Sequence, residues 1–273
     1  MDGEGWFHMI PHDYHIHTHF SCDCDADMTS MCRAAIDASI PEIGISEHFD
    51  LHPKDPCAGF FKADNWWKTL SLCKQEFTDL LTIRAGIELS EPHLYPGAVE
   101  AILRNYPWDY ALGALHWIGD DLIFEEEYFH RTEQVAYTEY FTELQRLVQS
   151  GMFDILAHMD IVKRYGVEHY GIFEPNKFEG QIRSILQIMA SRNLALELNT
   201  ITLRRPIQET SPSLQILQWF YEEGGQWVTL GSDAHSPEEV GAGIEKGISI
   251  IQSAGFKNLA SFKRRKPKHS PIT

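Results

Sequence analysis

The sequence contains few cysteines, and their placement argues against two common uses of this residue. There are five, Cys22, Cys24, Cys32, Cys57 and Cys73, and none forms a CxxC pair. An odd number confined to the first 73 residues predicts neither a disulfide framework nor a zinc finger. We therefore expect all five thiols to be reduced, with Cys22 and Cys24 near any metal bound by the preceding histidines.

Long apolar runs and a basic leader are also lacking. No stretch approaches the roughly 18 consecutive apolar residues of a membrane-spanning helix, and the opening residues MDGEGWFHMI carry no basic cluster. These absences predict a soluble, cytoplasmic protein with no membrane partner.

Basic residues are outnumbered, with 23 Lys and Arg against 39 Asp and Glu and a formal charge of -16. Nucleic-acid affinity rests on clustered cations, so nucleic acid is not an expected partner. Divalent cations bound in the folded protein would offset several of these carboxylates.

Two catalytic motifs are missing as well. Neither the GxSxG nucleophile elbow nor a P-loop occurs. Gly241, Gly243 and Gly247 are spaced GxGxxxG, which differs from the dinucleotide fingerprint and falls in a predicted helix.

The 273 residues, 43% of them hydrophobic, are enough for one large core. We predict a single domain over residues 1–262 and a frayed basic tail over residues 263–273.

Strand-like and helix-like segments alternate along this domain, a pattern typical of a parallel sheet with helices outside it. The predicted strands are MIPHDY (9–14), 42–46, 82–89, 109–117, 152–158, 193–199 and 226–235. The predicted helices are 28–39, 64–79, 96–104, 132–150, 178–191, 212–223 and a last one from Pro237 or Glu238.

Polar residues that bind metals stand where these strands end. In a closed βα barrel all strand carboxyl ends lie at one mouth, so such residues would face one cleft. They are His15, His17, His48, Glu88, His116, His158, Asn199, Asp233 and His235.

The HxH pair formed by His15 and His17 is the first of these. Alternation along a strand puts both imidazoles on one face. Imidazole is a common donor to zinc, iron and manganese, and the histidines at the other strand ends strengthen the metal interpretation of this short motif.

The motifs in this order resemble the polymerase and histidinol phosphatase (PHP) superfamily, and within it the histidinol-phosphatases. The matching segments, from about residue 13 to about residue 245, are HIHTHFSCD, GISEHFD, GIEL, GALHW, LAHMDIVKRYG, ELNTITLRRP and TLGSDAH. The resemblance implies a distorted (β/α)7 TIM-like barrel that binds two to three divalent metal ions, zinc, manganese or iron.

The resemblance also implies three ligand sets, with Glu88 bridging the first two. These sets are His15, His17, Glu88 and Asp233; Glu88, His116 and His158; and Asp23, His48 and His235. Many relatives carry a histidine at the position matched to Asp23. The oxygen ligand here would favour a harder ion such as manganese or weaken the third site.

Phosphate binding needs cations besides the metals. Lys163 and Arg164 follow His158, and Arg204 and Arg205 follow Asn199, in predicted loops at the same mouth. Arg164 and Arg204 match family positions that carry arginine. Asp233 or His235 would give the leaving alkoxide its proton, and the sequence does not choose between them.

The predicted activity is hydrolysis of L-histidinol phosphate to L-histidinol and phosphate, a step of histidine biosynthesis, by a metal-bridging hydroxide. The protein would work as a monomer or small homo-oligomer on a small-molecule phosphate ester. One alternative is another PHP-type phosphoesterase acting on nucleotides or small phosphate esters. A catalytically silent metal-stabilised binding module is the other, and the retained ligands and the charge of -16 argue against it.

Overall fold

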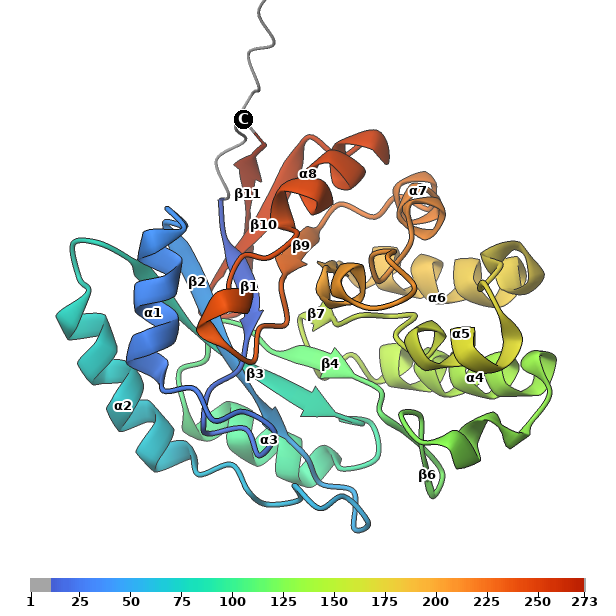
Figure 1. Cartoon of the computed structure of the whole chain (residues 1–273), viewed down its shortest axis with the longest axis horizontal. Helices are drawn as coiled ribbons and strands as arrows, with labels where there is room; N and C mark the ends of the chain where they lie inside the picture. The colour runs from blue at the N-terminus through green and yellow to red at the C-terminus, as the bar shows by residue number, and fades with distance from the viewer. Residues whose placement is uncertain (1–10, 273) are drawn as a thin grey trace, which may run out of the picture.

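The computed structural model describes residues 11–272 as one barrel of seven parallel strands with helices outside it (Figure 1). The sheet order is β1-β2-β3-β4-β7-β8-β9. A parallel bridge between Ile16 and Ala234 joins the two ends of the sheet, and the His17 N–H donates to the Ala234 carbonyl at 2.9 Å. The predicted (β/α)7 barrel is therefore confirmed.

The barrel strands are β1 (Asp13–Ile16), β2 (Glu42–Phe49), β3 (Thr82–Ser90), β4 (Leu112–Ala114), β7 (Ile155–Leu156), β8 (Ala195–Asn199) and β9 (Val228–Gly231). The α-helices are α1 (Met28–Asp37), α2 (Ala63–Glu76), α3 (Pro96–Asn105), α4 (Glu133–Ser150), α5 (Lys163–Tyr170), α6 (Glu179–Ser191), α7 (Leu214–Glu222) and α8 (Ile244–Ser253). Short 3-10 helices span Glu126–His130 (η1), Pro175–Phe178 (η2), Ile201–Arg204 (η3) and Pro237–Glu239 (η4). Two hairpins complete the fold, β5 (Trp117–Ile118) with β6 (Asp121–Leu122) and β10 (Asn258–Lys263) with β11 (Lys266–Pro271). All seven predicted strands are present, although Met9 and Ile10 of the first lie outside the described residues.

Tyr110 fills the barrel interior below the strand ends. It stacks on Tyr14 with ring centroids 5.0 Å apart, and its hydroxyl donates to the Tyr14 carbonyl at 2.6 Å. A Cβ at Gly44 or Gly86 would overlap the Tyr110 ring. Glycine in β2 and β3 therefore makes room for an aromatic plug, because the backbone of both strands passes close to it.

Helix boundaries follow the capping residues. The Asp27 carboxylate accepts the Ser30 N–H at 2.9 Å at the start of α1, and the Thr132 hydroxyl accepts the Val135 N–H at the start of α4. Gly151 ends α4 with a left-handed φ of 63°.

Two helical predictions need correction. Residues 163–170, predicted as a loop, form α5, where Gly166 lies so close to the Tyr137 ring that a Cβ would overlap it. The last helix begins at Ile244 rather than at Pro237 or Glu238, because Gly241 and Gly243 adopt φ values of 74° and 81°. Only Gly247 of that trio lies in α8.

The carboxyl-terminal segment is ordered, contrary to the predicted frayed tail. Strand β10 pairs with β11, and the Phe262 N–H donates to the Tyr14 hydroxyl at 3.1 Å. Phe262 packs with Tyr14 and Tyr110 in one buried cluster. Figure 1 shows the hairpin beside β1 and β9, where it covers the amino-terminal end of the barrel.

Cys22 and Cys57 form a disulfide, with Cα atoms 5.7 Å apart. The prediction that all five thiols are reduced is wrong for this pair, and right for Cys24, Cys32 and Cys73. The bond joins the loops that follow β1 and β2, and local sequence does not reveal this proximity of two residues 35 positions apart.

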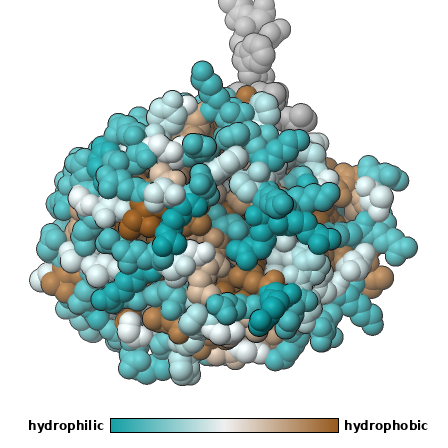
Figure 2. Space-filling view, turned by 180° about the vertical axis from the view of Figure 1, so that it is seen from behind, coloured by the Kyte–Doolittle hydropathy of each residue, from teal (hydrophilic) through white to brown (hydrophobic). Residues whose placement is uncertain are grey.

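The outer surface is largely polar. On the face shown in Figure 2 hydrophobic residues form separate patches within a mainly hydrophilic surface. Within residues 11–272 no helix is long and apolar enough to cross a membrane.

Candidate metal centre

The predicted ligands gather at the carboxyl-terminal mouth of the barrel because each follows or ends a parallel strand. His15 lies in β1, His48 in β2 and Glu88 in β3. His116 and His158 each follow a strand by two residues, after β4 and β7. Asp233 stands two residues after β9.

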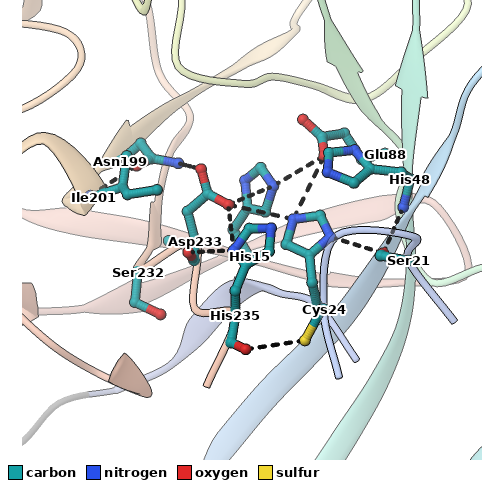
Figure 3. Close-up of polar contacts among 12 residues, drawn as sticks. His15, Ser21, Cys24, His48, Glu88, Asn199, Ile201, Ser232, Asp233 and His235 are labelled. Carbon is teal, nitrogen blue, oxygen red and sulfur yellow. Dashed lines mark hydrogen bonds and ion pairs between the residues drawn. The ribbon is translucent and has the colours of Figure 1, made fainter. Parts of the chain in front are cut away.

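Glu88 is fully buried within this cluster, and Figure 3 shows it beside His48. Its Oε2 lies 3.3 Å from His15 Nε2 and 3.5 Å from His17 Nε2. Its Oε1 lies 2.9 Å from His158 Nε2 and 3.6 Å from His116 Nε2. One carboxylate therefore has an oxygen toward each of the first two predicted ligand sets, as a bridging ligand requires.

Asp233 completes the first set. Its Oδ1 lies 3.3 Å from His17 Nε2 and 3.7 Å from His15 Nε2. The Asn199 amide donates to its other oxygen at 3.2 Å and so orients the carboxylate toward the imidazoles (Figure 3).

Asp23, His48 and His235 also meet. Asp23 Oδ2 lies 3.4 Å from His48 Nε2 and 3.2 Å from His235 Nε2. His17 stacks on both imidazoles, with ring centroids 4.3 Å from each. The third predicted set is therefore contiguous with the first.

Buried donor atoms without hydrogen bonds indicate that these residues suit metal ions. Within residues 11–272, His15 Nε2, His17 Nε2 and Glu88 Oε2 are buried and have no hydrogen-bond partner. Polar atoms left unpaired in a protein interior are costly, and a cation shared by two imidazoles and a carboxylate removes that penalty.

The imidazoles of the cluster divide into two groups by pKa: burial lowers the pKa of His17 and His116, whereas for His15 and His48 neighbouring carboxylates outweigh burial and raise it well above the usual value. Burial lowers the pKa of His116 to about 4, against the pull of Glu88, and burial with neighbouring imidazoles lowers that of His17 to about 3. Burial alone would raise the pKa of Glu88, but His48 and His15 hold it well below its usual range. Neutral imidazole and ionised carboxylate are the forms that bind metals.

Glu197, which was not among the predicted ligands, orients the His15 imidazole and holds the backbone of His158. Its Oε1 lies 2.7 Å from His15 Nδ1, and its Oε2 accepts the His158 N–H at 2.9 Å. The signal in the sequence was its position in LELN, two residues before Asn199 and therefore on the same face of β8.

Other buried groups hold two further imidazoles, those of His17 and His116. The Ser21 hydroxyl lies 3.0 Å from His17 Nδ1 and donates to Glu47 at 2.6 Å. Ser90 Oγ lies 3.2 Å from His116 Nδ1. Fixing the second ring nitrogen sets the tautomer, and so leaves Nε2 free to bind a metal.

Two of the predicted ligands have strained backbones. His158 and Asp233 have backbone φ values of 24° and 55°, in a region that residues other than glycine rarely adopt. Such conformations persist where the surrounding structure imposes them, and they concentrate at functional sites.

A cavity of about 330 Å³ opens over the cluster. Arg164 and Arg205 line it, together with Phe124 and Tyr165, whose rings lie 5.0 Å apart. Burial lowers the pKa of Arg164, and the positive charge of Arg205 adds to this effect. Two guanidinium groups facing one cavity provide a site for an anion.

The structure brings neither Lys163 nor Arg204 to the wall of this cavity. Lys163 is fully buried and its Nζ lies 2.8 Å from Asp160 and 2.7 Å from Glu209. The Arg204 guanidinium donates to the Ser232 carbonyl at 2.9 Å, and its Nε lies 3.4 Å from Glu239. Both cations therefore hold segments of the chain together.

Comparisons with known proteins agree with this geometry. A probable histidinol-phosphatase from Deinococcus radiodurans is 28% identical over 264 residues, covering 93% of this chain and 97% of the relative. The histidinol-phosphatase of Lactococcus lactis is 28% identical over 254 residues, covering 92% and 93%.

Solved structures share the fold. The crystal structure of histidinol phosphate phosphatase from Lactococcus lactis, complexed with zinc, L-histidinol and phosphate, has a TM-score of 0.88. It is 27% identical and covers 95% of this chain and 99% of its own. The PHP domain family matches residues 13–201, more than half of the sequence. The chain therefore belongs to the PHP domain family.

Proposed function

We propose that this protein is a metal-dependent phosphomonoesterase that hydrolyses L-histidinol phosphate to L-histidinol and phosphate. The observation that carries the proposal is the arrangement at the barrel mouth. Glu88 lies between two groups of imidazoles, beneath a cavity that presents Arg164 and Arg205. The relatives named above act on, or hold, the same alcohol and phosphate.

Two to three divalent ions are expected in this cluster. His15, His17 and Asp233 would hold one with Glu88, and His116 and His158 a second; Asp23, His48 and His235 would hold the third. When bound, such ions activate water as the nucleophile and polarise the phosphate.

The protein's own groups bind and orient the ester. Arg164 and Arg205 pair with the phosphate oxygens and hold the phosphorus over the ligand cluster. Phe124 and Tyr165 form an aromatic wall beside the arginines, which suits the flat imidazole of histidinol.

The departing alkoxide needs a proton, and two groups on the cavity wall could hold it. The Asp233 carboxylate accepts a hydrogen bond from the Asn199 amide and faces His15 and His17. The side chain of His235 is more exposed to solvent than that of Asp233. The His235 ring pairs with Asp23, and its backbone N–H donates to Glu239 at 3.0 Å. We keep both as candidates for proton transfer.

The proposal is tested by measuring phosphate release from L-histidinol phosphate beside a panel of nucleoside monophosphates. We expect kcat/KM for L-histidinol phosphate to exceed that for every nucleotide by at least a hundredfold. Faster hydrolysis of a nucleotide would favour another phosphoesterase activity. Absence of phosphate release from all esters in zinc- or manganese-loaded protein would contradict an enzymatic role.

Arg205→Gln provides a second test. It should raise KM for the phosphate ester without changing metal content, because the guanidinium faces the cavity and contacts no predicted ligand. Arg204→Gln is the matched neighbour, and should lower thermal stability more than it raises KM. Equal effects of the two variants on KM would contradict the assignment. We also expect a cytoplasmic protein that is a monomer or a small homo-oligomer.

A further inference from the structure

A second cavity, of about 380 Å³, lies at the opposite end of the barrel from the metal centre. Arg84, near the start of β3, lines it, as does Asp109, just before β4. Lys74 of α2 and the hairpin residues Lys263 and Arg264 complete its charged wall. Because the barrel strands are parallel, their starts and ends lie at opposite mouths, so this cavity is separate from the ligand cluster.

The charges lining this cavity are unbalanced. Arg84 is neutralised by Glu42, which accepts from its Nε and Nη2 at 2.9 Å each. Lys74 lies 3.8 Å from Asp109, a carboxylate that also accepts the backbone N–H groups of Ala85 and Arg264. Lys263 and Arg264 form no ion pair within residues 11–272. Positive charge is therefore in excess here, although the whole chain carries -16.

The backbone of the hairpin turn gives an independent indication. Arg264 and Arg265 have φ values of 52° and 61°. Hairpin turns in which both central residues have positive φ usually contain Asn-Gly, because larger side chains are strained in that conformation. Arg265 has a structural role, since it donates to both oxygens of Asp154 at 2.8 and 3.1 Å. Arg264 has no such partner in the described chain, and its side chain lines the cavity.

We propose that this cavity, formed by Lys74, Lys263 and Arg264 at the closed end of the barrel, is a binding site for a small phosphate-bearing anion. Guanidinium and ammonium groups supplied from a helix and a hairpin surround the space from different directions, which suits a tetrahedral anion with several oxygens. Burial and the charges of Arg84 and Arg264 lower the pKa of Lys74 despite Asp109, and a bound anion would oppose that effect. The site does not depend on the proposed hydrolase activity.

Inorganic phosphate is the probe, and calorimetric titration is the measurement. The metal centre would also bind phosphate, so the titrations are done in protein that carries Arg164→Gln and Arg205→Gln. Ions bound at the metal centre still attract phosphate in that background, so the site in the second cavity is identified as the binding event that Arg164→Gln and Arg205→Gln leave unchanged. Arg264→Gly should weaken it at least tenfold while leaving or raising the melting temperature, because glycine adopts the φ of 52° without strain.

The matched control is Lys68→Gln, which removes the same charge from an exposed position of α2 outside the cavity. Lys74→Gln should weaken phosphate binding at least fivefold, and Lys68→Gln less than twofold. Unchanged binding in the Arg264→Gly variant would overturn the proposal. An equal loss of affinity in the Lys68→Gln variant would show an effect of net charge alone and would also overturn the proposal. Absence of phosphate binding at this cavity in the protein that carries only Arg164→Gln and Arg205→Gln would overturn it too.

Discussion

Replacing Glu197 by glutamine should impair the metal centre although this residue is not a predicted ligand. Its Oε2 accepts two hydrogen bonds, one from the backbone N–H of His158 at 2.9 Å and one from the side-chain amide of Asn199 at 3.1 Å. In the variant the amide oxygen must keep this position, since an NH2 group there would face two donors. The NH2 group would then face His15 Nδ1.

An NH2 group at that position reverses the tautomer of His15. In the natural protein Nδ1 lies 2.7 Å from a carboxylate oxygen and can donate to it, which leaves Nε2 as an acceptor. Beside an NH2 group Nδ1 becomes the acceptor, and the proton moves to Nε2. That atom faces Glu88 and Asp233 and is the one that would bind a metal.

We expect Glu197→Gln to weaken metal binding by about 10–100-fold, or roughly 1.4–2.7 kcal/mol, the usual effect of losing an outer-shell partner. Competition with a chromophoric zinc chelator measures the affinity, and kcat/KM with excess metal shows whether activity is recovered. Asp154→Asn is the control: it alters a partly buried carboxylate at the other end of the barrel, paired with Arg265. Unchanged affinity in Glu197→Gln, or equal loss in the control, would refute the tautomer argument.

Three further results are expected. Glu88→Gln should be the most damaging single change among the predicted ligands, because an amide cannot bridge two metals. Elemental analysis should show that the variant has lost more than one ion per chain. Retention of all ions would contradict the ligand assignment. Burial lowers the pKa of His12 from 6.5 to about 4, so between these values the unfolded chain binds more protons and the free energy of unfolding decreases as the pH is lowered. The loss should approach about 3 kcal/mol at pH 4, and urea titrations of His12→Phe should lack that component; parallel profiles for the two proteins would exclude it. Replacing Cys22 and Cys57 by serine should lower the free energy of unfolding by about 3–4 kcal/mol, as expected for a link across 35 residues. A dithiol should lower the stability of the natural protein and leave that of the variant unchanged. If the dithiol has no effect on the natural protein, the disulfide is contradicted.

The sequence predicted the parts of this protein that depend on local pattern. Apolar runs alternating with amphipathic segments indicate parallel strands and outer helices, and in a closed barrel every strand end faces the same mouth. Residues as distant as His15 and Asp233 were therefore expected to meet, and their side chains lie within 3.7 Å. Capping by Asp27 and Gly151 was predictable for the same reason, because it involves only neighbouring residues.

Tertiary contacts decided the rest. Arg204 and Arg205 are adjacent, yet η3 ends between them, so one guanidinium turns to the Ser232 carbonyl while the other faces the cavity. Glu197 acquires its role only because β8 lies beside β7 and is separated from β1 by β9 alone.

The last residues form a hairpin rather than a loose tail because Phe262 packs in the buried cluster that contains Tyr14 and Tyr110. These two residues stand about 250 and 150 positions earlier in the chain. Local periodicity specifies which face of an element is apolar or carries ligands. Which partner covers that face, and which of two neighbouring side chains reaches a cavity, depends on contacts between distant segments that form only when the barrel closes.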